Sequence, residues 1–215
     1  MSYRLLVFDW DGTIIDSAAS IAECIRDASR DLGLEVPERE RASHVIGLGL
    51  HDAMRIAVPG LPAERYPEFV ASYRRHFLER KDAMQLFDGM RQLLEDLSKK
   101  HLLAIATGKS RRGLDRELEF HALRSLFAAS RCADETNPKP HPAMLTEIME
   151  ALAVQKDSSL MIGDTSHDLE MARAAGVAAL AVTYGAHPEE GLRACAPLEC
   201  FSSVTQLREW LTKNA

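Results

Sequence analysis

The segment VFDWDGTIIDS, residues 7–17, places two acidic residues one position apart at the end of an apolar run. Side chains alternate along a strand, so Asp9 and Asp11 point to the same side and Trp10 points to the other. Two carboxylates this close cannot both stay ionised cheaply unless a cation neutralises one or a proton is held by the other. Either outcome is useful: a divalent metal on Asp9 would leave Asp11 free to hold and exchange a proton, which gives one group for nucleophilic attack and another for acid–base work.

The residues directly after this acidic pair are typical of a tight turn. Gly12 and Thr13 follow Asp11 without a gap, and the backbone N–H groups of such a turn suit the oxygens of a phosphate. We therefore expect a phosphate-binding turn beside the two carboxylates.

Short apolar runs recur along the chain and indicate buried strands. They cover residues 5–9, 102–107, 159–163 and 178–183, with a weaker candidate at residues 127–132. Helical patterns of hydrophobic residues separate them. Strands that alternate with helices predict an α/β fold, a doubly wound parallel sheet covered on both faces. Ligands of such sheets bind beyond the carboxyl ends of the strands, which is where Asp9 stands.

The first two predicted strands are separated by far more chain than one crossover helix needs. The patterns between them are helical, with prolines and glycines at the turns. We therefore predict a core domain formed by residues 1–16 and 86–215. Residues 17–85 are predicted to form an inserted, all-helical cap domain that can cover the site.

Composition argues against several classes of protein. Of the 215 residues, 46% are hydrophobic and 27% are charged, which is the balance of a soluble globular protein. The formal net charge of -6 disfavours nucleic acid and anionic membrane surfaces as partners. The four cysteines lack metal-ligand spacing, so reduced thiols in the cytoplasm are expected, without zinc or disulfides. The apolar run before Asp9 is too short for a signal peptide or a membrane span.

Four short motifs occur in a fixed order along the chain. They are Asp9-Trp10-Asp11-Gly12-Thr13, Thr107 in IATGK, Lys139 in NPKPHP, and Gly163, Asp164 and Asp168 in IGDTSHD. With these motifs the chain resembles the haloacid dehalogenase (HAD) superfamily, in particular its phosphoglycolate phosphatase-like branch with a helical cap. The resemblance spans most of the chain and implies a Rossmann-like core that carries the cap as an insert.

The resemblance also implies a reaction. It is the hydrolysis of a small-molecule phosphate monoester, phosphoglycolate-like or a sugar phosphate, through an aspartyl-phosphate intermediate. Asp9 would attack phosphorus, and Asp11 would first protonate the leaving oxygen and then deprotonate the attacking water. Lys139 would neutralise the phosphate and hold Asp9, while the Thr107 hydroxyl and the Gly108 N–H would bind the transferring oxygens.

A magnesium ion is the cofactor that the resemblance implies. Its ligands would be the Asp9 carboxylate, the main-chain oxygen of Asp11 and Asp164. Asp168 would lie nearby, as a ligand through water or as a hydrogen-bond partner of the ligands. A set of oxygen ligands with retained water suits magnesium.

Three other activities fit part of this pattern. A phosphosugar mutase would share the catalytic residues and differ in how the cap excludes water. A dehalogenase would need neither Asp11 nor Asp164, because its leaving group takes no proton. A receiver-like signalling module would carry the acids, Thr and Lys in another order and would lack the large insert.

Some residues receive no role from the sequence. Trp10 is expected to pack in the core, and Lys109 faces either the cap or water. Arginines of the predicted cap, such as Arg55, Arg74 and Arg75, could contact an anionic substrate, although a solvated helix face is the commoner environment. The identity of the substrate and the oligomeric state stay open.

Overall fold

The computed structural model describes residues 3–215. Its centre is a six-stranded sheet in which each pair of neighbouring strands is parallel, in the order β3-β2-β1-β4-β5-β6. This arrangement confirms the predicted doubly wound α/β fold. The strands are β1 (Leu5–Phe8), β2 (Leu102–Thr107), β3 (Ala129–Cys132), β4 (Ser159–Gly163), β5 (Ala178–Val182) and β6 (Cys200–Phe201).

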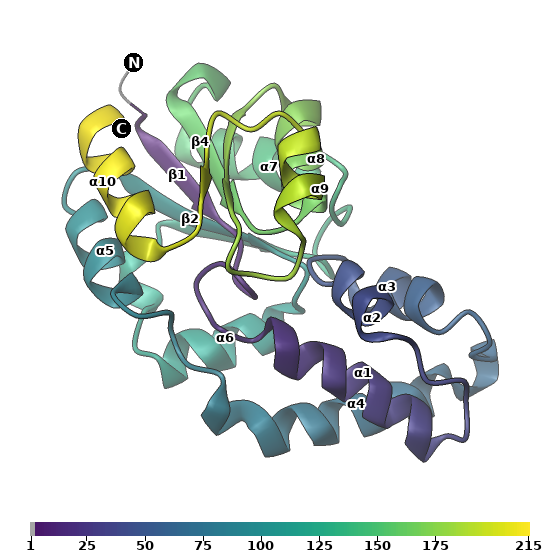
Figure 1. The fold of residues 1–215 in the computed structure, drawn as a ribbon. Helices are drawn as coiled ribbons and strands as arrows, with labels where there is room; N and C mark the ends of the chain where they lie inside the picture. The colour runs from purple at the N-terminus through teal and green to yellow at the C-terminus, as the bar shows by residue number, and fades with distance from the viewer. Residues whose placement is uncertain (1–2) are drawn as a thin grey trace.

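The central strand β1 forms because four consecutive apolar residues can be buried on both faces of a parallel sheet. Leu6 and Phe8 pack into the hydrophobic cluster beneath α5, α6 and α10, whereas Leu5 and Val7 pack into the cluster beneath α7 and α8. Helices therefore cover both faces of the sheet (Figure 1). These helices are α5 (Met90–Leu97), α6 (Arg111–Phe120), α7 (Ala143–Leu152), α8 (Ser166–Ala175), α9 (Glu189–Ala194) and α10 (Val204–Asn214).

The segment between β1 and α5, residues 17–85, is helical, as its sequence pattern predicts, and lies beyond the carboxyl ends of the central strands (Figure 1). Its apolar faces form a hydrophobic cluster separate from the two clusters of the sheet, with residues such as Ile25, Met54 and Phe69 at its centre. Its helices are α1 (Ala18–Asp31), α2 (Arg39–His44), α3 (Leu50–Ala57) and α4 (Tyr66–Arg80).

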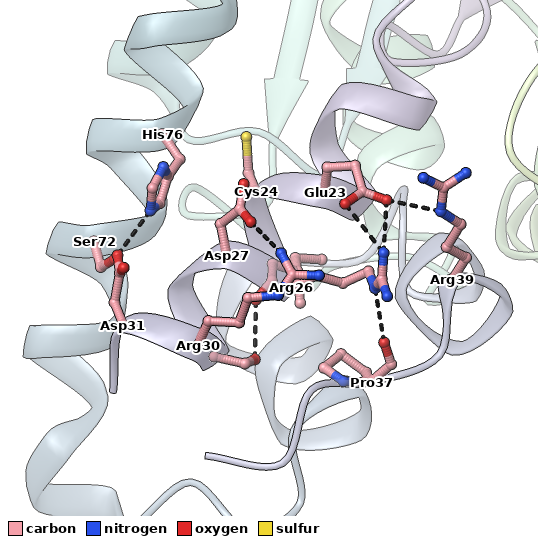
Figure 2. Close-up of polar contacts among 12 residues, drawn as sticks. Glu23, Cys24, Arg26, Asp27, Arg30, Asp31, Pro37, Arg39, Ser72 and His76 are labelled. Carbon is pink, nitrogen blue, oxygen red and sulfur yellow. Dashed lines mark hydrogen bonds and ion pairs between the residues drawn. The ribbon is translucent and has the colours of Figure 1, made fainter. Parts of the chain in front are cut away.

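Polar contacts join the two longest helices of this segment, α1 and α4. The Asp31 carboxylate near the end of α1 accepts a hydrogen bond of 2.5 Å from the Ser72 hydroxyl, and it lies 2.7 Å from Nε2 of His76 (Figure 2). Arg75 on α4 also donates to Asp31, at 2.5 Å. These contacts fix the α4 face that carries Tyr73 and Phe77 toward the core.

Two chain segments connect the helical insert to the sheet, and they run side by side. The Asp16 N–H donates to the Gln85 carbonyl at 2.8 Å, and the Phe87 N–H donates to the Ile14 carbonyl at 3.1 Å. Ile15 and Leu86 form an antiparallel bridge between the same segments. The pairing lies where the sequence places the domain boundaries, 16/17 and 85/86, although the division into domains itself stays a prediction.

Short 3₁₀ helices complete the described chain. They are η1 (Ala63–Arg65), η2 (Lys81–Ala83), η3 (Arg124–Leu126) and η4 (Lys156–Ser158). Over residues 3–215, no helix combines the length and the apolar character that crossing a membrane requires.

Candidate active site

The carboxyl ends of three neighbouring strands bring the predicted site residues together. Asp9 follows β1, Thr107 is the last residue of β2, and Asp164 follows β4. Lys139 reaches the same place from the loop between β3 and α7. All four residues are at most 2% exposed. The sheet places β1 between β2 and β4, and this brings together residues as distant in the chain as Asp9 and Asp164.

Lys139 lies between two carboxylates in a fully buried position. Its Nζ is 2.6 Å from Oδ1 of Asp9 and 2.6 Å from Oδ1 of Asp168. Burial lowers the pKa of Lys139, but the charges of Asp168 and Asp9 outweigh this effect, so its pKa stands above the ordinary value. The two carboxylates therefore favour the charged form of Lys139, which fixes the Asp9 side chain.

Asp9 keeps one oxygen without a hydrogen-bond donor. Its Oδ1 accepts from Lys139, whereas no group of residues 3–215 donates to the buried Oδ2. Burial raises the pKa of Asp9 well above its ordinary value, against the lowering effect of Lys139, and the nearby Asp168 and Asp164 raise it further. Three buried carboxylates thus share one ammonium group, which leaves the cluster with an excess of negative charge.

Asp164 is held by neighbours on both sides of its carboxylate. Oδ1 accepts from the Thr13 hydroxyl at 2.7 Å, and Oδ2 accepts from the Ala186 N–H at 2.7 Å. A Cβ on either Gly12 or Gly185 would lie 2.2 Å from Oδ2, so the backbone approaches this carboxylate as only glycine permits. Burial and the charge of Asp168 raise the pKa of Asp164 to about 7, against these hydrogen bonds.

The Gly12–Thr13 turn makes contacts that the sequence did not reveal. The Gly12 N–H donates to the Ile15 carbonyl at 2.8 Å, and the Thr13 side chain orients Asp164. Gly12 has φ +80, a conformation that glycine adopts at low cost. The phosphate-binding role predicted for this turn stays a prediction.

Asp168 caps helix α8 with one carboxylate oxygen and contacts Lys139 with the other. Its Oδ2 accepts from the Thr165 N–H at 3.0 Å and from the Thr165 hydroxyl at 2.7 Å, which completes a capping box at the start of α8. Its Oδ1 contacts Lys139 without hydrogen-bond geometry. The helix cap therefore holds Asp168 so that its second oxygen faces the site.

These carboxylates fit a divalent cation. One oxygen each from Asp9, Asp164 and Asp168 lie within 4.8 Å of one another, and all three residues are buried. The undonated Oδ2 of Asp9 and the excess negative charge are what a bound cation would relieve. A set of ligands made only of oxygen atoms favours magnesium over softer metals.

Asp11 lies in a second, partly buried ion cluster, which the sequence did not reveal. Both of its oxygens lie 2.9 Å from Nζ of Lys109, and Ser17 donates to Oδ1 at 2.8 Å. Lys109 is also 3.5 Å from Oε1 of Glu117 on α6, and Trp10 donates to the other Glu117 oxygen at 2.9 Å. The pair of Trp10 and Asp11 is therefore tied, through Lys109 and Glu117, to the helix that follows β2.

The Lys109 ammonium also contacts the helical insert. It lies 4.8 Å from the centre of the Phe77 ring on α4, in cation–π geometry. Burial lowers the pKa of Lys109, but the charges of Asp11 and Glu117 outweigh this effect and leave its pKa raised. The sequence left open whether Lys109 faces the cap or water, and its side chain faces the insert.

A turn of the insert lies directly on the β2 end of the site. A Cβ on Gly108 would come within 2.4 Å of the Leu48 carbonyl oxygen and 2.5 Å of the Gly47 carbonyl oxygen. Gly47 itself has φ +91, and a Cβ there would lie 3.1 Å from Oγ1 of Thr165. The turn at residues 47–49 therefore closes over Thr107, whose hydroxyl accepts from the Lys109 N–H at 3.2 Å.

Histidines hold the same part of the insert against the core. Nε2–H of His167 and Nε2–H of His187 both donate to the His44 carbonyl, at 2.8 and 3.0 Å. The His44 ring stacks on the His187 ring with centroids 4.9 Å apart. Burial and the neighbouring His167 lower the pKa of His187 to about 4, so this ring is neutral at pH 7. These three histidines therefore have a structural role at the junction of the insert and the core.

A cavity of about 580 Å³ opens between the insert and the core. Asp9, Asp11, Thr107 and Gly108 line its inner end, so the candidate catalytic groups face one shared space. Cavities of about 300–1,000 Å³ are typical of small-molecule sites. The arrangement can therefore bind a small molecule with its reacting group beside Asp9.

Comparisons with known proteins agree with this arrangement. A family model described as haloacid dehalogenase-like hydrolase matches residues 6–182. The chain is 34% identical to the protein named "Probable phosphatase IndB" of Dickeya dadantii (strain 3937), over 97% of this chain and 95% of that protein. It is 30% identical to the phosphoglycolate phosphatase of Aliivibrio fischeri (strain ATCC 700601 / ES114), over 85% of each.

A solved structure, that of a hydrolase from Pseudomonas syringae, matches the whole of both chains with a TM-score of 0.89 and 19% identity. At this identity the likeness concerns the fold. The family model spans most of the chain, and the two relatives named above are called phosphatases. The protein therefore belongs to the haloacid dehalogenase-like hydrolases, in the phosphoglycolate phosphatase-like branch, and is a phosphatase.

Proposed function

We propose that the protein is a magnesium-dependent phosphatase that hydrolyses a small-molecule phosphate monoester through an aspartyl-phosphate intermediate. The observation that carries this proposal is the state of Asp9. One of its oxygens is fixed by Lys139, and the other is buried, undonated and next to Asp164 at the inner end of a cavity. An oxygen in this state supports the proposal that Asp9 attacks the phosphorus atom.

The proposed reaction has two steps. In the first, Oδ2 of Asp9 forms a bond to phosphorus, the bond to the leaving oxygen breaks, and Asp11 gives that oxygen a proton. In the second, Asp11 takes a proton from water, the water oxygen bonds to phosphorus, and the bond to Asp9 breaks to release phosphate. To meet the leaving oxygen, Asp11 has to release Lys109, whose charge Glu117 then continues to balance.

The remaining predicted residues supply positive charge and hydrogen bonds. Lys139 keeps Asp9 in place and offsets the charge of the phosphoryl oxygens, and the Thr107 hydroxyl with the Gly108 N–H binds those oxygens. Asp9, Asp164 and the Asp11 main-chain oxygen would hold Mg²⁺, with Asp168 beside them. The ion would supply charge neutralisation between the carboxylate and the phosphate dianion.

The division into domains, the cellular location and a second candidate function are proposals as well. We propose that residues 17–85 act as the cap and that residues 1–16 and 86–215 act as the catalytic core. The spacing of the cysteines supports a cytoplasmic location. A phosphosugar mutase stays the second candidate function, because the turn at residues 47–49 packs closely enough on Gly108 to restrict water.

The experiment that tests the proposal is phosphate release from a panel of phosphorylated metabolites with Mg²⁺, for the wild type, Asp9→Asn and Asp157→Asn. Asp157 is an exposed acid of η4 and serves as the matched control. We expect Asp9→Asn to fold normally and release no phosphate, while Asp157→Asn behaves as the wild type. Phosphate release by Asp9→Asn at the wild-type rate would refute the mechanism. Isomerisation of a sugar phosphate without release of phosphate would favour the mutase.

A further inference from the structure

The cavity has more room than the phosphoryl group and a small leaving group need. Its volume is about 580 Å³, within the range of about 300–1,000 Å³ that holds ligands of drug-like size. A two-carbon leaving group such as that of phosphoglycolate would leave most of this space to water. The other residues that line the cavity would therefore contact the rest of the substrate, and their chemistry indicates what it is.

The walls beyond the catalytic residues are largely apolar. Helix α1 contributes Ile21 and Ile25, the turn after α2 contributes Leu48, and α4 contributes Tyr73 and Phe77. Such walls gain free energy by covering apolar surface and offer few partners to the hydroxyl groups of a sugar. They favour a leaving group that has an apolar body, aromatic or aliphatic.

The mouth of the cavity is basic, and its arginines lack acidic partners. Arg74 comes from α4, Arg112 and Arg116 come from α6, and all three are exposed. Most arginines of residues 3–215 make an ion pair with a carboxylate. The arginines without such an ion pair are Arg4, Arg74, Arg91, Arg112, Arg116 and Arg173. Half of these six line this one cavity.

This gathering is selective in a chain with an excess of acidic residues. Arg55 and Arg75, the other cap arginines considered from the sequence, lie beside Asp52 and Asp31 and are absent from the cavity lining. Arg112 and Arg116 lie four positions apart and therefore on one face of α6. Cations left unpaired on two facing elements, in a protein of net charge -6, are arranged to receive an anion.

No carboxylate that lines the cavity forms an ion pair with Arg74, Arg112 or Arg116. Asp11 and Glu117 are paired with Lys109, and Asp9 is paired with Lys139. Asp134 also lines the cavity, and its Oδ1 accepts from the Arg111 N–H at 2.8 Å. Basic, acidic and apolar residues thus line one shared cavity, and its arginines are not ion-paired with its carboxylates.

We propose that the preferred substrate carries a second anionic group, a carboxylate or a phosphate, at the far end of an apolar leaving group, and that Arg112, Arg116 and Arg74 bind it. The inference rests on the proposed phosphatase function and adds the chemical class of its substrate. Phosphoglycolate has a second anion but no apolar body, so it meets only part of this requirement.

A pair of matched substrates tests the proposal. One is para-propylphenyl phosphate, and the other is its analogue in which a carboxylate replaces the terminal methyl of the propyl chain. The two phenols are leaving groups of nearly equal acidity, so the ratio of their kcat/KM values reports recognition of the carboxylate. We expect the wild type to prefer the carboxylate by about tenfold or more at low salt, with the preference falling as ionic strength rises.

Two double variants assign the preference to the arginines. Arg112→Gln/Arg116→Gln is expected to reduce the ratio to about two or less. The control, Arg4→Gln/Arg173→Gln, removes the same charge from arginines that are outside the cavity lining, and it should keep the wild-type ratio. Circular dichroism verifies that both variants are folded.

Each failure has a distinct meaning. If neither aryl phosphate releases phosphate and the metabolite panel is also negative, the proposed function fails. If both are hydrolysed with a ratio near one in the wild type, the function stands and the second anion is refuted. A high ratio that survives Arg112→Gln/Arg116→Gln, or one that falls equally in the control variant, overturns the assignment to these arginines.

Discussion

Replacing Lys109 with methionine removes the one positive charge that faces Asp11 and Glu117, while it keeps the apolar stem beneath Phe77. The three side chains of this ion cluster are 10%, 11% and 15% exposed, in the order Lys109, Asp11, Glu117. Breaking a buried ion pair from one side costs about 3–5 kcal/mol. Because the cluster borders a cavity, we expect the lower value, about 3 kcal/mol, which lowers the Tm of a chain of this size by about 6–12 °C.

Thermal and urea unfolding, followed by circular dichroism, measure this loss. A charge-balanced variant, Lys109→Met/Asp11→Asn/Glu117→Gln, is expected to regain most of the stability, since it leaves no unpaired charge in the cluster. The reasoning is refuted if Lys109→Met alone lies within about 1 kcal/mol of the wild type, where surface ion pairs fall. It is also refuted if the charge-balanced variant is no more stable than the single one.

Two further predictions concern Asp164 and its surroundings. Gly12→Ala places a Cβ about 2 Å from Oδ2 of Asp164 at a positive φ, so we expect a loss of more than about 2 kcal/mol in urea unfolding; Gly60→Ala, in open space, is the control and should change little. The pKa of Asp164 in the folded protein, about 7, is higher than in the unfolded chain. The protonated carboxyl therefore stabilises the fold fully at pH values below the unfolded pKa, and this stabilisation is lost as pH rises through 7. A metal ion needs the ionised carboxylate, so Mg²⁺ should raise Tm more at pH 8 than at pH 5; equal increments at the two pH values would contradict this.

Much of the fold was predictable because it depends on local patterns. A run such as residues 5–8 is apolar on both faces, and this decides a central parallel strand without any information on its neighbours. The edge strand β6 escaped prediction because it has two residues, Cys200 and Phe201, too few for a pattern. The weak candidate at residues 127–132 is β3, over Ala129–Cys132, with three of its four residues only partly buried.

The site was predictable where one residue type at one spacing carries the chemistry. Asp9, Thr107, Lys139 and Asp164 meet at the strand ends as expected. Contacts that depend on the rotation of a helix were not predictable. Glu117 meets Lys109 because α6 turns one particular face toward β1, and no motif marks that face.

The same limit applied to the arginines. Arg74, Arg112 and Arg116 look like other exposed arginines in the sequence, and only their shared position around the cavity and their lack of acidic partners separate them. A pattern of residue types does not show which cations are already paired, because most partners are distant in sequence. The partner of Arg75, for example, is Asp31.

The insertion of the helical segment after β1 has a consequence for how such a protein diversifies. The candidate reacting groups lie on strand ends held by the sheet, whereas most of the apolar walls belong to a separate hydrophobic cluster joined to the sheet by two adjacent segments. Mutations in those walls can therefore accumulate under selection for a new metabolite without disturbing Asp9 or Lys139. One ancestral catalyst can in this way give rise to enzymes with many different substrates.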